Sequence, residues 1–221
     1  SYSRRGVDKL IEEQRITVNG KKVRLGLKVG SNDEIRIDGE LIFKPRKKKK
    51  SIYLIFNKPT GIECTTNQNI NNNITDFIGY PSRIFPIGRL DKDSEGLIFL
   101  TNDGEIVNKI LRSENNNEKE YLVNVNKKIN SNFLKNISEG VKLKKTKTKP
   151  CEVKKITNYS FKIILTQGLN RQIRKMCGLF NYKVKNLIRT RIININLGNL
   201  KIGKFRKFSK FELDQLLENI N

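Results

Sequence analysis

The segment from Lys44 to Lys50 constrains the fold of this chain more than any other stretch. Pro45 cannot donate a backbone hydrogen bond, and five cationic residues follow it without a counter-charge. Like charges repel one another and keep such a segment extended, which is typical of a linker. We therefore expect three parts: a small domain over residues 1–43, a basic linker over 44–50 and a larger domain over 51–221.

The front segment has the pattern of a compact α+β module. Apolar residues between positions 7 and 11 are spaced as on one face of a helix. Residues 16–18 alternate between apolar and polar side chains and lead into Asn19-Gly20, a dipeptide that favours a tight hairpin turn. A second alternation over residues 34–37 predicts a further strand.

The charge of the chain points to a polyanionic partner. Its 45 Lys and Arg residues exceed its 22 Asp and Glu residues, which gives a net charge of +23. Such a surplus favours nucleic acid, although a basic face can also be merely solvated. Within the front module we expect RNA contacts from Arg4, Arg5, Lys9, Lys21 and Lys22.

The larger domain contains better defined strands. Four short segments are rich in β-branched and aromatic residues. They cover residues 53–56, 97–100, 121–125 and 161–165. Helical spacing of apolar residues follows Asn170 and recurs over 213–220. Because the strands do not alternate with long crossover helices, we expect an α+β fold with a mainly antiparallel mixed sheet flanked by helices.

Composition also excludes several kinds of chemistry. The chain has no histidine, which removes imidazole bases, His-dependent nucleophilic triads and zinc sites with His ligands. Cys64, Cys151 and Cys177 are too far apart for a C-x-x-C pair and suit a reducing compartment. No apolar run approaches the ~20 residues that span a bilayer. We expect a cytoplasmic protein without membrane contact, or an organellar one if a targeting segment preceded Ser1.

The densest polar cluster covers residues 88–96, directly before the apolar strand at 97–100. It contains three carboxylates, Asp91, Asp93 and Glu95. Their spacing matches the first positions of a calcium-binding loop, but Asn102 stands where that loop requires a bidentate Glu. We therefore reject a calcium site.

Two other interpretations of this cluster depend on its residue types alone. Asp91, Asp93 and Asp103 could hold Mg²⁺ in a two-metal nuclease, although Arg89 and Lys92 already supply positive charge there. A solvated acidic turn before a strand is the other interpretation. Spacing does not choose between them.

Residues 85–104 resemble the signature of the RsuA family of ribosomal RNA pseudouridine synthases, with Gly88-Arg89-Leu90-Asp91 at its centre. Three further stretches resemble that family in the same order along the chain. They are Asn57 to Gly61, Glu118 to Val123 and Gln167 to Met176. The amino-acid sequences of these stretches are most similar to the RluF type, which acts on 23S ribosomal RNA. The front module resembles an S4 RNA-binding domain whose first helix, expected before Ser3, is missing.

The resemblance implies isomerisation of uridine to pseudouridine without a cofactor or a metal. It implies that Asp91 is catalytic, either as a nucleophile at C1′ or as a base toward the sugar. Arg89 is then expected to displace the target base or fill the gap that the base leaves. Tyr121 is expected to stack on that base, and Leu187 to pack beneath it.

The resemblance also assigns the basic residues of the helical motif. It implies that Arg174 is the partner that keeps Asp91 ionised and oriented. Arg171 is an alternative partner or a phosphate ligand, and Lys175 is expected to contact RNA. Lys142 to Lys149 and Lys201 to Lys210 are expected to follow the RNA backbone.

The expected partner is thus 23S rRNA, with a tRNA anticodon stem-loop as a possible second substrate, and we expect a monomer. The main alternative function is a noncatalytic RNA-binding or ribosome-assembly factor, and the metal-dependent nuclease comes third. An isomerase needs Asp91 but no metal, a binder needs neither, and a nuclease needs a metal and cuts the strand.

Overall fold

The computed structural model describes residues 2–30, 32–43, 50–111, 116–144 and 146–220. The chain divides into two compact units, Ser1–Lys50 and Ser51–Asn221. Most of the expected basic linker, residues 44–49, lies outside the described residues. Within the described ranges, no helix has the length and apolar character needed to cross a membrane.

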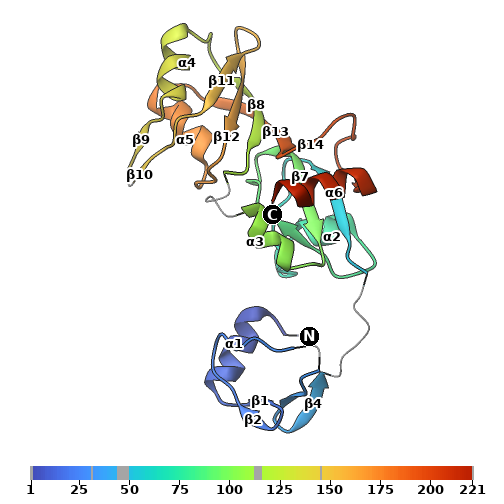
Figure 1. The fold of residues 1–221 in the computed structure, drawn as a ribbon. Coiled ribbons are helices and arrows are strands. Elements are labelled where there is room, and N and C mark those ends of the chain that lie inside the picture. Colours follow the sequence, from blue (N-terminus) through green and yellow to red (C-terminus); the bar gives the residue numbers. More distant parts are fainter. Residues whose placement is uncertain (1, 31, 44–49, 112–115, 145, 221) are drawn as a thin grey trace. The chain divides into compact units, whose positions relative to one another are not determined.

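The first unit packs a helix on a small antiparallel sheet (Figure 1). Its elements are α1 (Arg4–Glu12), β1 (Ile16–Val18), β2 (Lys21–Lys22), β3 (Ile35–Ile37) and β4 (Glu40–Phe43). Leu10, Ile16 and Ile37 form its buried core. Asn19 and Gly20 both adopt positive φ, as a tight turn between β1 and β2 requires. The expected helix, hairpin and following strand are present, and β4 extends the sheet beyond what the sequence pattern predicts.

Within the described residues, the second unit is built on a nine-stranded mixed sheet with the strand order β11-β12-β8-β13-β7-β5-β15. β14 pairs with β13, and β6 pairs with β7. The strands of this sheet are β5 (Tyr53–Lys58), β6 (Phe85–Ile87), β7 (Glu95–Thr101), β8 (Lys119–Val125), β11 (Glu152–Lys155), β12 (Ser160–Leu165), β13 (Val184–Ile192), β14 (Ile195–Asn196) and β15 (Phe205–Lys207).

Helices and one separate hairpin complete this unit. The helices are α2 (Ile74–Ile78), α3 (Glu105–Leu111), α4 (Ser131–Ser138), α5 (Gln172–Leu179) and α6 (Lys210–Asn219), and the hairpin joins β9 (Lys142–Leu143) to β10 (Thr146–Lys147). Among the described strand pairs of the large sheet, only β7 with β13 is parallel. The predicted α+β fold with a mainly antiparallel mixed sheet is confirmed.

β5 and β7 are covered on both faces, which explains why their sequences are apolar without alternation. On one face, Ile55, Leu97 and Phe99 pack in one cluster with buried residues of α3 and α6. On the other face, the intervening residues of both strands pack with Ile74 of α2. The strand that follows residues 88–96 is therefore fixed rigidly from two sides.

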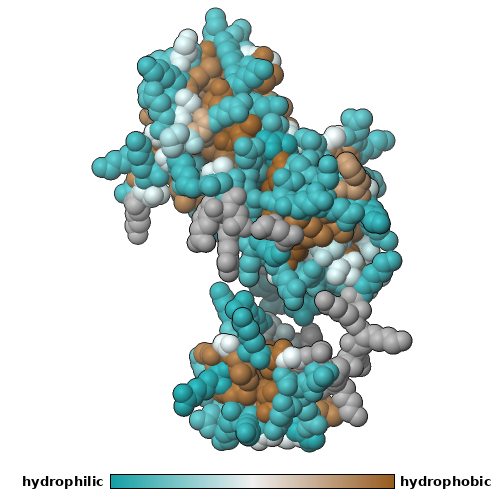
Figure 2. Space-filling view, viewed as in Figure 1, coloured by the Kyte–Doolittle hydropathy of each residue, from teal (hydrophilic) through white to brown (hydrophobic). Residues whose placement is uncertain are grey.

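The other half of the sheet has a different core. Here α4 and α5 cover one face of β8, β12 and β13 (Figure 1). Phe133 of α4 and Met176 of α5 are buried in the cluster that contains Val123 and Ile163. The surface of the unit is mainly hydrophilic, with apolar residues visible between the elements that enclose these cores (Figure 2).

Gly96 is the point where the two halves of the sheet meet. Its neighbours are Lys58 on the antiparallel strand β5 and Arg189 on the parallel strand β13. A Cβ atom at position 96 would lie 2.4 Å from the carbonyl oxygen of Arg189, and Gly96 has a φ of +106°. Both the close approach and the backbone conformation require glycine.

We expect Gly96→Ala to lower the free energy of unfolding by about 3 kcal/mol or more, because it adds an overlap with backbone to a strained φ. Urea denaturation followed by far-UV circular dichroism measures this change, since the chain has no Trp to report on unfolding. Gly104→Ala is the control: no atom lies within 4 Å of its added Cβ. It should change stability by no more than about 0.5 kcal/mol. Equal denaturation midpoints for the two variants would contradict the assignment.

Candidate active site

Asp91 lies in the loop that joins β6 to β7. The loop turns tightly, because the backbone N–H of Ser94 donates to the carbonyl of Asp91 over 3.0 Å. It is also braced from outside: the N–H of Gly61 donates to the carbonyl of Lys92 over 2.7 Å. Gly61 ends the Asn57 to Gly61 stretch, so two motifs that are distant in sequence meet at this loop. The side chain of Asp91 is 30% exposed.

A cleft of about 710 Å³ opens beside this carboxylate. Its lining includes Arg89, Asp91, Tyr121, Arg171, Leu187 and Arg189. The first five of these residues were all expected from sequence to belong to the site, and the structure brings them together. The volume lies in the range that small-molecule and nucleotide-sized groups occupy in proteins.

The floor of the cleft is one face of β8 and β13. Tyr121 of β8 pairs directly with Arg189 of β13, and Val123 pairs with Leu187. Residues that are directly paired, or two apart on one strand, share a face of the sheet. Tyr121, Leu187 and Arg189 therefore stand on the same face, the one that lines the cleft. Leu187 is almost fully buried, whereas Tyr121 is partly exposed.

Arg171 contacts both aspartates of the loop. Its guanidinium donates to the two carboxylate oxygens of Asp93, each over 2.9 Å, and its Nη1 lies 3.8 Å from Oδ2 of Asp91. Arg171 has a positive φ of 51° immediately before α5, which is an uncommon conformation for a residue with a large side chain. The bidentate bond to Asp93 offsets the cost of that conformation.

The structure places Arg174 differently from the sequence expectation. Its Nη2 donates to the backbone carbonyl of Asp93 over 2.8 Å and to Oγ of Ser94, and its Nε lies 3.4 Å from Oδ2 of Asp93. Arg174 thus fixes the loop through Asp93, and the ion pair to Asp91 comes from Arg171. Arg174 lies on α5, three residues after Arg171, and both arginines contact Asp93.

These contacts determine the ionisation of Asp93. The hydrogen bonds from Arg171 hold the pKa of the Asp93 carboxyl below its usual value, and the charge of Arg174 acts in the same direction. Asp93 therefore stays ionised and serves as the anchor between α5 and the loop.

Asp103 belongs to a different structural element. Its carboxylate accepts a hydrogen bond from the hydroxyl of Tyr53 over 2.7 Å and another from the backbone N–H of Glu105, at the start of α3. Within the described ranges, no three Cys, Asp or Glu side chains group as metal ligands would. The nuclease interpretation, which needs Asp103 beside Asp91 and Asp93, therefore finds no support in the geometry.

Three cations near the loop were not singled out by sequence reasoning. Lys58 is fully buried and donates from Nζ to the carbonyls of Pro59 and Ile62 over 2.8 and 2.9 Å. Lys119 and Arg189 line the cleft. Sequence spacing could have identified Lys119 and Arg189. Lys119 precedes the predicted site residue Tyr121 by two positions, and Arg189 follows Leu187 by two. A period of two on a strand places each pair on one face.

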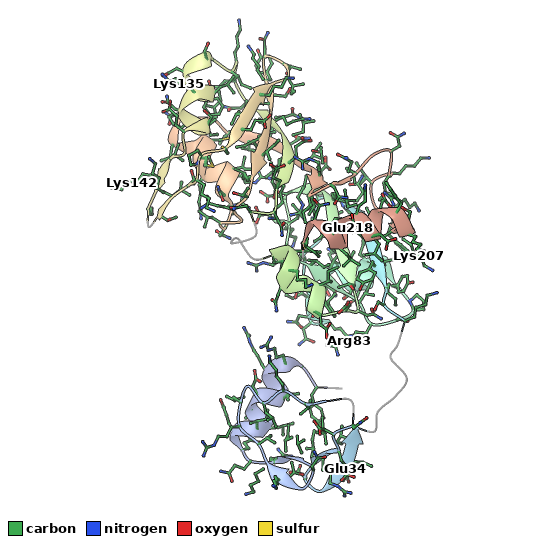
Figure 3. All side chains as sticks on the ribbon, in the orientation of Figure 1. Glu34, Arg83, Lys135, Lys142, Lys207 and Glu218 are labelled. Carbon is green, nitrogen blue, oxygen red and sulfur yellow. The ribbon has the colours of Figure 1, made fainter. Side chains whose placement is uncertain are left out.

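The other predicted RNA contacts named below are exposed, whereas Lys145 of the predicted stretch Lys142 to Lys149 lies outside the described residues. Lys175 lies on α5 and donates to the side chain of Asn170. Lys142 lies on the β9–β10 hairpin and Lys207 on the edge strand β15, both on the outer surface of the second unit (Figure 3). The predicted RNA contacts of the first unit are all exposed as well. They are Arg4, Arg5, Lys9, Lys21 and Lys22.

Comparisons with known proteins give consistent similarities. The family model for RNA pseudouridylate synthase matches residues 52–178, and the model for the S4 domain matches residues 1–35. A crystal structure described as a pseudouridylate synthase superposes with a TM-score of 0.73 at 28% sequence identity, covering 97% of this chain and 94% of that one.

Two curated relatives illustrate the range of sequence similarity. The dual-specificity RNA pseudouridine synthase RluF of Escherichia coli (strain K12) is 48% identical over 218 residues, which are 99% of this chain and 75% of that protein. The ribosomal large subunit pseudouridine synthase B of Bacillus subtilis (strain 168) is 32% identical over 223 residues, which are 97% of this chain and 90% of that protein.

We expect Arg171→Gln to raise the pKa of Asp93 toward its ordinary value, because the bidentate hydrogen bond is the main cause of the lowered pKa. Carbon-13 NMR titration of the Asp carboxyl groups measures it. In the wild type the Arg171–Asp93 ion pair should break only as the pH falls through that lowered pKa. Lys175→Gln, on the same helix but bonded to Asn170, should leave the titration of Asp93 unchanged. A pKa of Asp93 that is identical in wild type and Arg171→Gln would refute this account.

Proposed function

This chain belongs to the RNA pseudouridylate synthase family, and on that premise we propose how its residues isomerise uridine to pseudouridine in ribosomal RNA. The observation that carries the proposal is the position of Asp91. This partly exposed carboxylate stands at the edge of a nucleotide-sized cleft, on a loop held by backbone hydrogen bonds and two arginines.

The reaction breaks the bond between N1 of uracil and C1′ of the ribose and forms a bond between C5 and C1′. Asp91 is the proposed catalytic residue. As a nucleophile its carboxylate forms an ester bond to C1′ while uracil leaves with the electron pair of the broken bond. As a base it removes the proton from C2′ while uracil leaves in the same way. In either route the uracil turns and C5 bonds to C1′. In the first route the ester bond breaks and its electron pair returns to the carboxylate of Asp91, and in the second the proton returns from Asp91 to C2′. The proton of C5 is then lost while N1 gains one.

Three residues of the cleft are proposed to hold the extruded nucleotide. Arg89 is exposed at the mouth of the cleft, where it can occupy the gap that the target base leaves in the RNA. Tyr121 offers an aromatic face from the floor, and base–aromatic stacking contributes ~1–3 kcal/mol per base. Leu187 closes the floor beneath the base and excludes water from it.

Arg171 and Arg174 are proposed to position the catalytic loop. Arg171 is the cation nearest to Asp91 and keeps that carboxylate oriented, while both arginines anchor Asp93. Since α5 carries Arg174 and Arg171 directly precedes it, displacement of the helix would displace the loop. Lys175, exposed on the same helix, is proposed to contact an RNA phosphate.

The first unit is proposed to be an S4-type RNA-binding domain, followed by the linker and the catalytic domain over 51–221. The first turn of α1 carries Arg4 and Arg5 and no acidic residue. Cations at this end of a helix oppose the helix dipole, so their placement costs stability unless an anion lies nearby. An RNA phosphate supplies that anion, and Lys9, Lys21 and Lys22 extend the same basic surface.

We propose 23S rRNA as the principal substrate, in the cytoplasm, with the protein acting as a monomer. The resemblance of the motif sequences to the RluF type supports this choice. So does the name of the Bacillus subtilis relative, a ribosomal large subunit pseudouridine synthase. The term dual-specificity in the name of the Escherichia coli relative supports a second substrate, for which a tRNA anticodon stem-loop is our candidate. The alternative of a noncatalytic RNA-binding factor accounts for the basic surface but not for the cleft.

We expect Asp91→Asn to lower the rate of pseudouridine formation by about 10³-fold or more while RNA affinity stays within about threefold, because it removes the reacting carboxylate and keeps the shape of the side chain. The measurement is chemical mapping of pseudouridine in 23S rRNA and tRNA after incubation with the purified chain in EDTA.

Asp103→Asn is the control for this experiment, because its carboxylate binds Tyr53 and the start of α3 and does not line the cleft. It should retain the modification pattern of the wild type. Full conversion by Asp91→Asn would exclude Asp91 as the catalytic residue. No modified site on any RNA with the wild type, together with salt-sensitive binding, would favour the noncatalytic factor.

We also expect the double variant Arg4→Gln/Arg5→Gln to weaken RNA binding and to reduce the slope of log K against log salt by ~0.7–0.9 for each phosphate that it no longer neutralises. Filter binding across a series of KCl concentrations from about 50 to about 300 mM measures this slope. Arg36→Gln serves as the control, because Arg36 already pairs with Glu34. An unchanged slope in the double variant would argue against RNA binding by α1.

A further inference from the structure

Arg189 occupies the centre of the site without a role in the scheme above. It is 4% exposed, lines the cleft, and stands on the cleft face of β13. The residue across from it on β8 is Tyr121, the proposed stacking partner of the base. Leu187 lies two positions before it on the same face. Its neighbours in the floor are thus groups that are proposed to surround the target uracil.

The guanidinium of Arg189 is held firmly and yet is incompletely bonded. Its Nε donates to the backbone carbonyl of Leu97 over 2.6 Å. Its Nη2 is buried without a hydrogen-bond partner, and among the ion pairs of the described residues none includes Arg189. A buried donor on a charged group without an acceptor is costly to a folded protein. Since Arg189 also lines the cleft, a group that enters the cleft and reaches the guanidinium would supply the acceptor.

The surroundings of Arg189 add positive charge rather than neutralise it. Lys119, which lines the same cleft, has a pKa lowered to about 8 by burial and by the charge of Arg189. Burial also lowers the pKa of Lys58, and the charge of Arg189 acts in the same direction. Lys58, Gly96, Arg189 and Tyr121 are consecutive partners across four strands. Arg189 and Lys119, the two cations of the cleft floor, therefore favour a group that carries or develops negative charge.

We propose that Arg189 is a catalytic residue that donates a hydrogen bond from Nη2 to a carbonyl oxygen of the target uracil and stabilises the anion that uracil becomes when its bond to C1′ breaks. This inference rests on the proposed function and extends it to the leaving group. It holds for both routes open to Asp91, because in both of them uracil takes the electron pair of the N1–C1′ bond.

The charge balance of the step makes this role specific. Asp91 loses its negative charge as it bonds to C1′ or takes the proton of C2′, and the same unit of charge appears on uracil. That charge spreads over N1 and the two carbonyl oxygens, so a donor at either oxygen stabilises it. When C5 bonds to C1′, the charge returns to Asp91, because the ester bond breaks or Asp91 gives its proton back to C2′. C5 then loses its proton and N1 gains one.

The experiment uses the full chain and an RNA that carries a single target uridine at the site mapped with the wild type. Arg189→Gln should lower the single-turnover rate constant for loss of uridine by about 10²–10³-fold, the effect of removing one preorganised donor from a developing anion. Arg189→Lys, which keeps the charge but not the fork of donors, should lower it less. Affinity for the RNA should remain within about threefold in both variants, since the donor acts on charge that is absent from the bound ground state.

A second RNA distinguishes leaving-group stabilisation from a structural role. With 5-fluorouridine at the target position, the fluorine withdraws electrons and stabilises the uracil anion by itself. The loss of rate caused by Arg189→Gln should therefore be about tenfold smaller with 5-fluorouridine than with uridine. Liquid chromatography of nuclease digests, which separates uridine from its isomer pseudouridine, measures the disappearance of each intact nucleoside, with mass spectrometry to identify the peaks.

Arg191→Gln is the matched control. Arg191 lies on the same strand and bonds to Glu118 and the carbonyl of Ile193, but it does not line the cleft. It should retain the wild-type rate on both RNAs. Thermal denaturation by circular dichroism establishes which variants are folded, and if Arg189→Gln is not, the comparison of the two RNAs is made with Arg189→Lys.

Wild-type rates in the folded Arg189 variants, or equal losses with uridine and 5-fluorouridine, would overturn the inference while the proposed function stands. Absence of pseudouridine with the wild-type chain would overturn the proposed function itself, and the inference with it. A loss that is selective for uridine supports both.

Discussion

The close approach of β7 to β13 at Gly96 is the constraint on which the rest of the site depends. The strand register places Lys58, Gly96, Arg189 and Tyr121 in one row across β5, β7, β13 and β8, and the missing side chain at position 96 lets the backbone of β13 approach β7 closely there. Along this row, β5 pairs with β7 and β13 pairs with β8 in antiparallel fashion, whereas β7 and β13 form the one parallel pair among the described strands. The loop that carries Asp91 leads directly into β7 beside this row, and Asp91 lines the cleft.

Sequence reasoning succeeds here where local physics decides the outcome. β5 and β7 are buried on both faces, so their residues form unbroken apolar runs that few structures other than a core strand accommodate. The Asn19-Gly20 turn is fixed by the left-handed conformation that these two residues tolerate. Asp91 was predicted from its motif, and the structure places it beside the cleft.

The parts that sequence did not predict depend on tertiary contacts. β13 carries Lys185, Asn186, Arg189 and Arg191 among its apolar residues and contains two irregularities in its register, so no period of two is visible along it. From sequence alone, Arg189 has the residue type of an exposed position. Its burial follows from the central place of β13 in the sheet, between β8 and β7. Both arginines contact Asp93, and of the two only Arg171 also forms an ion pair with Asp91, which follows from how Arg171 and α5 meet the loop. A motif cannot encode that orientation.

The structure divides its positive charge into two populations with different physical behaviour. Exposed residues such as Arg4, Lys142 and Lys207 act through water and are screened within about 10 Å at 0.1 M salt. Arg189 and Lys58 are buried, so dissolved ions screen them far less. Salt should therefore weaken the capture of RNA much more than it slows the chemical step once the nucleotide is bound. A chain without histidine can in this way bind a polyanion loosely and still hold a strong, fixed field where the glycosidic bond breaks.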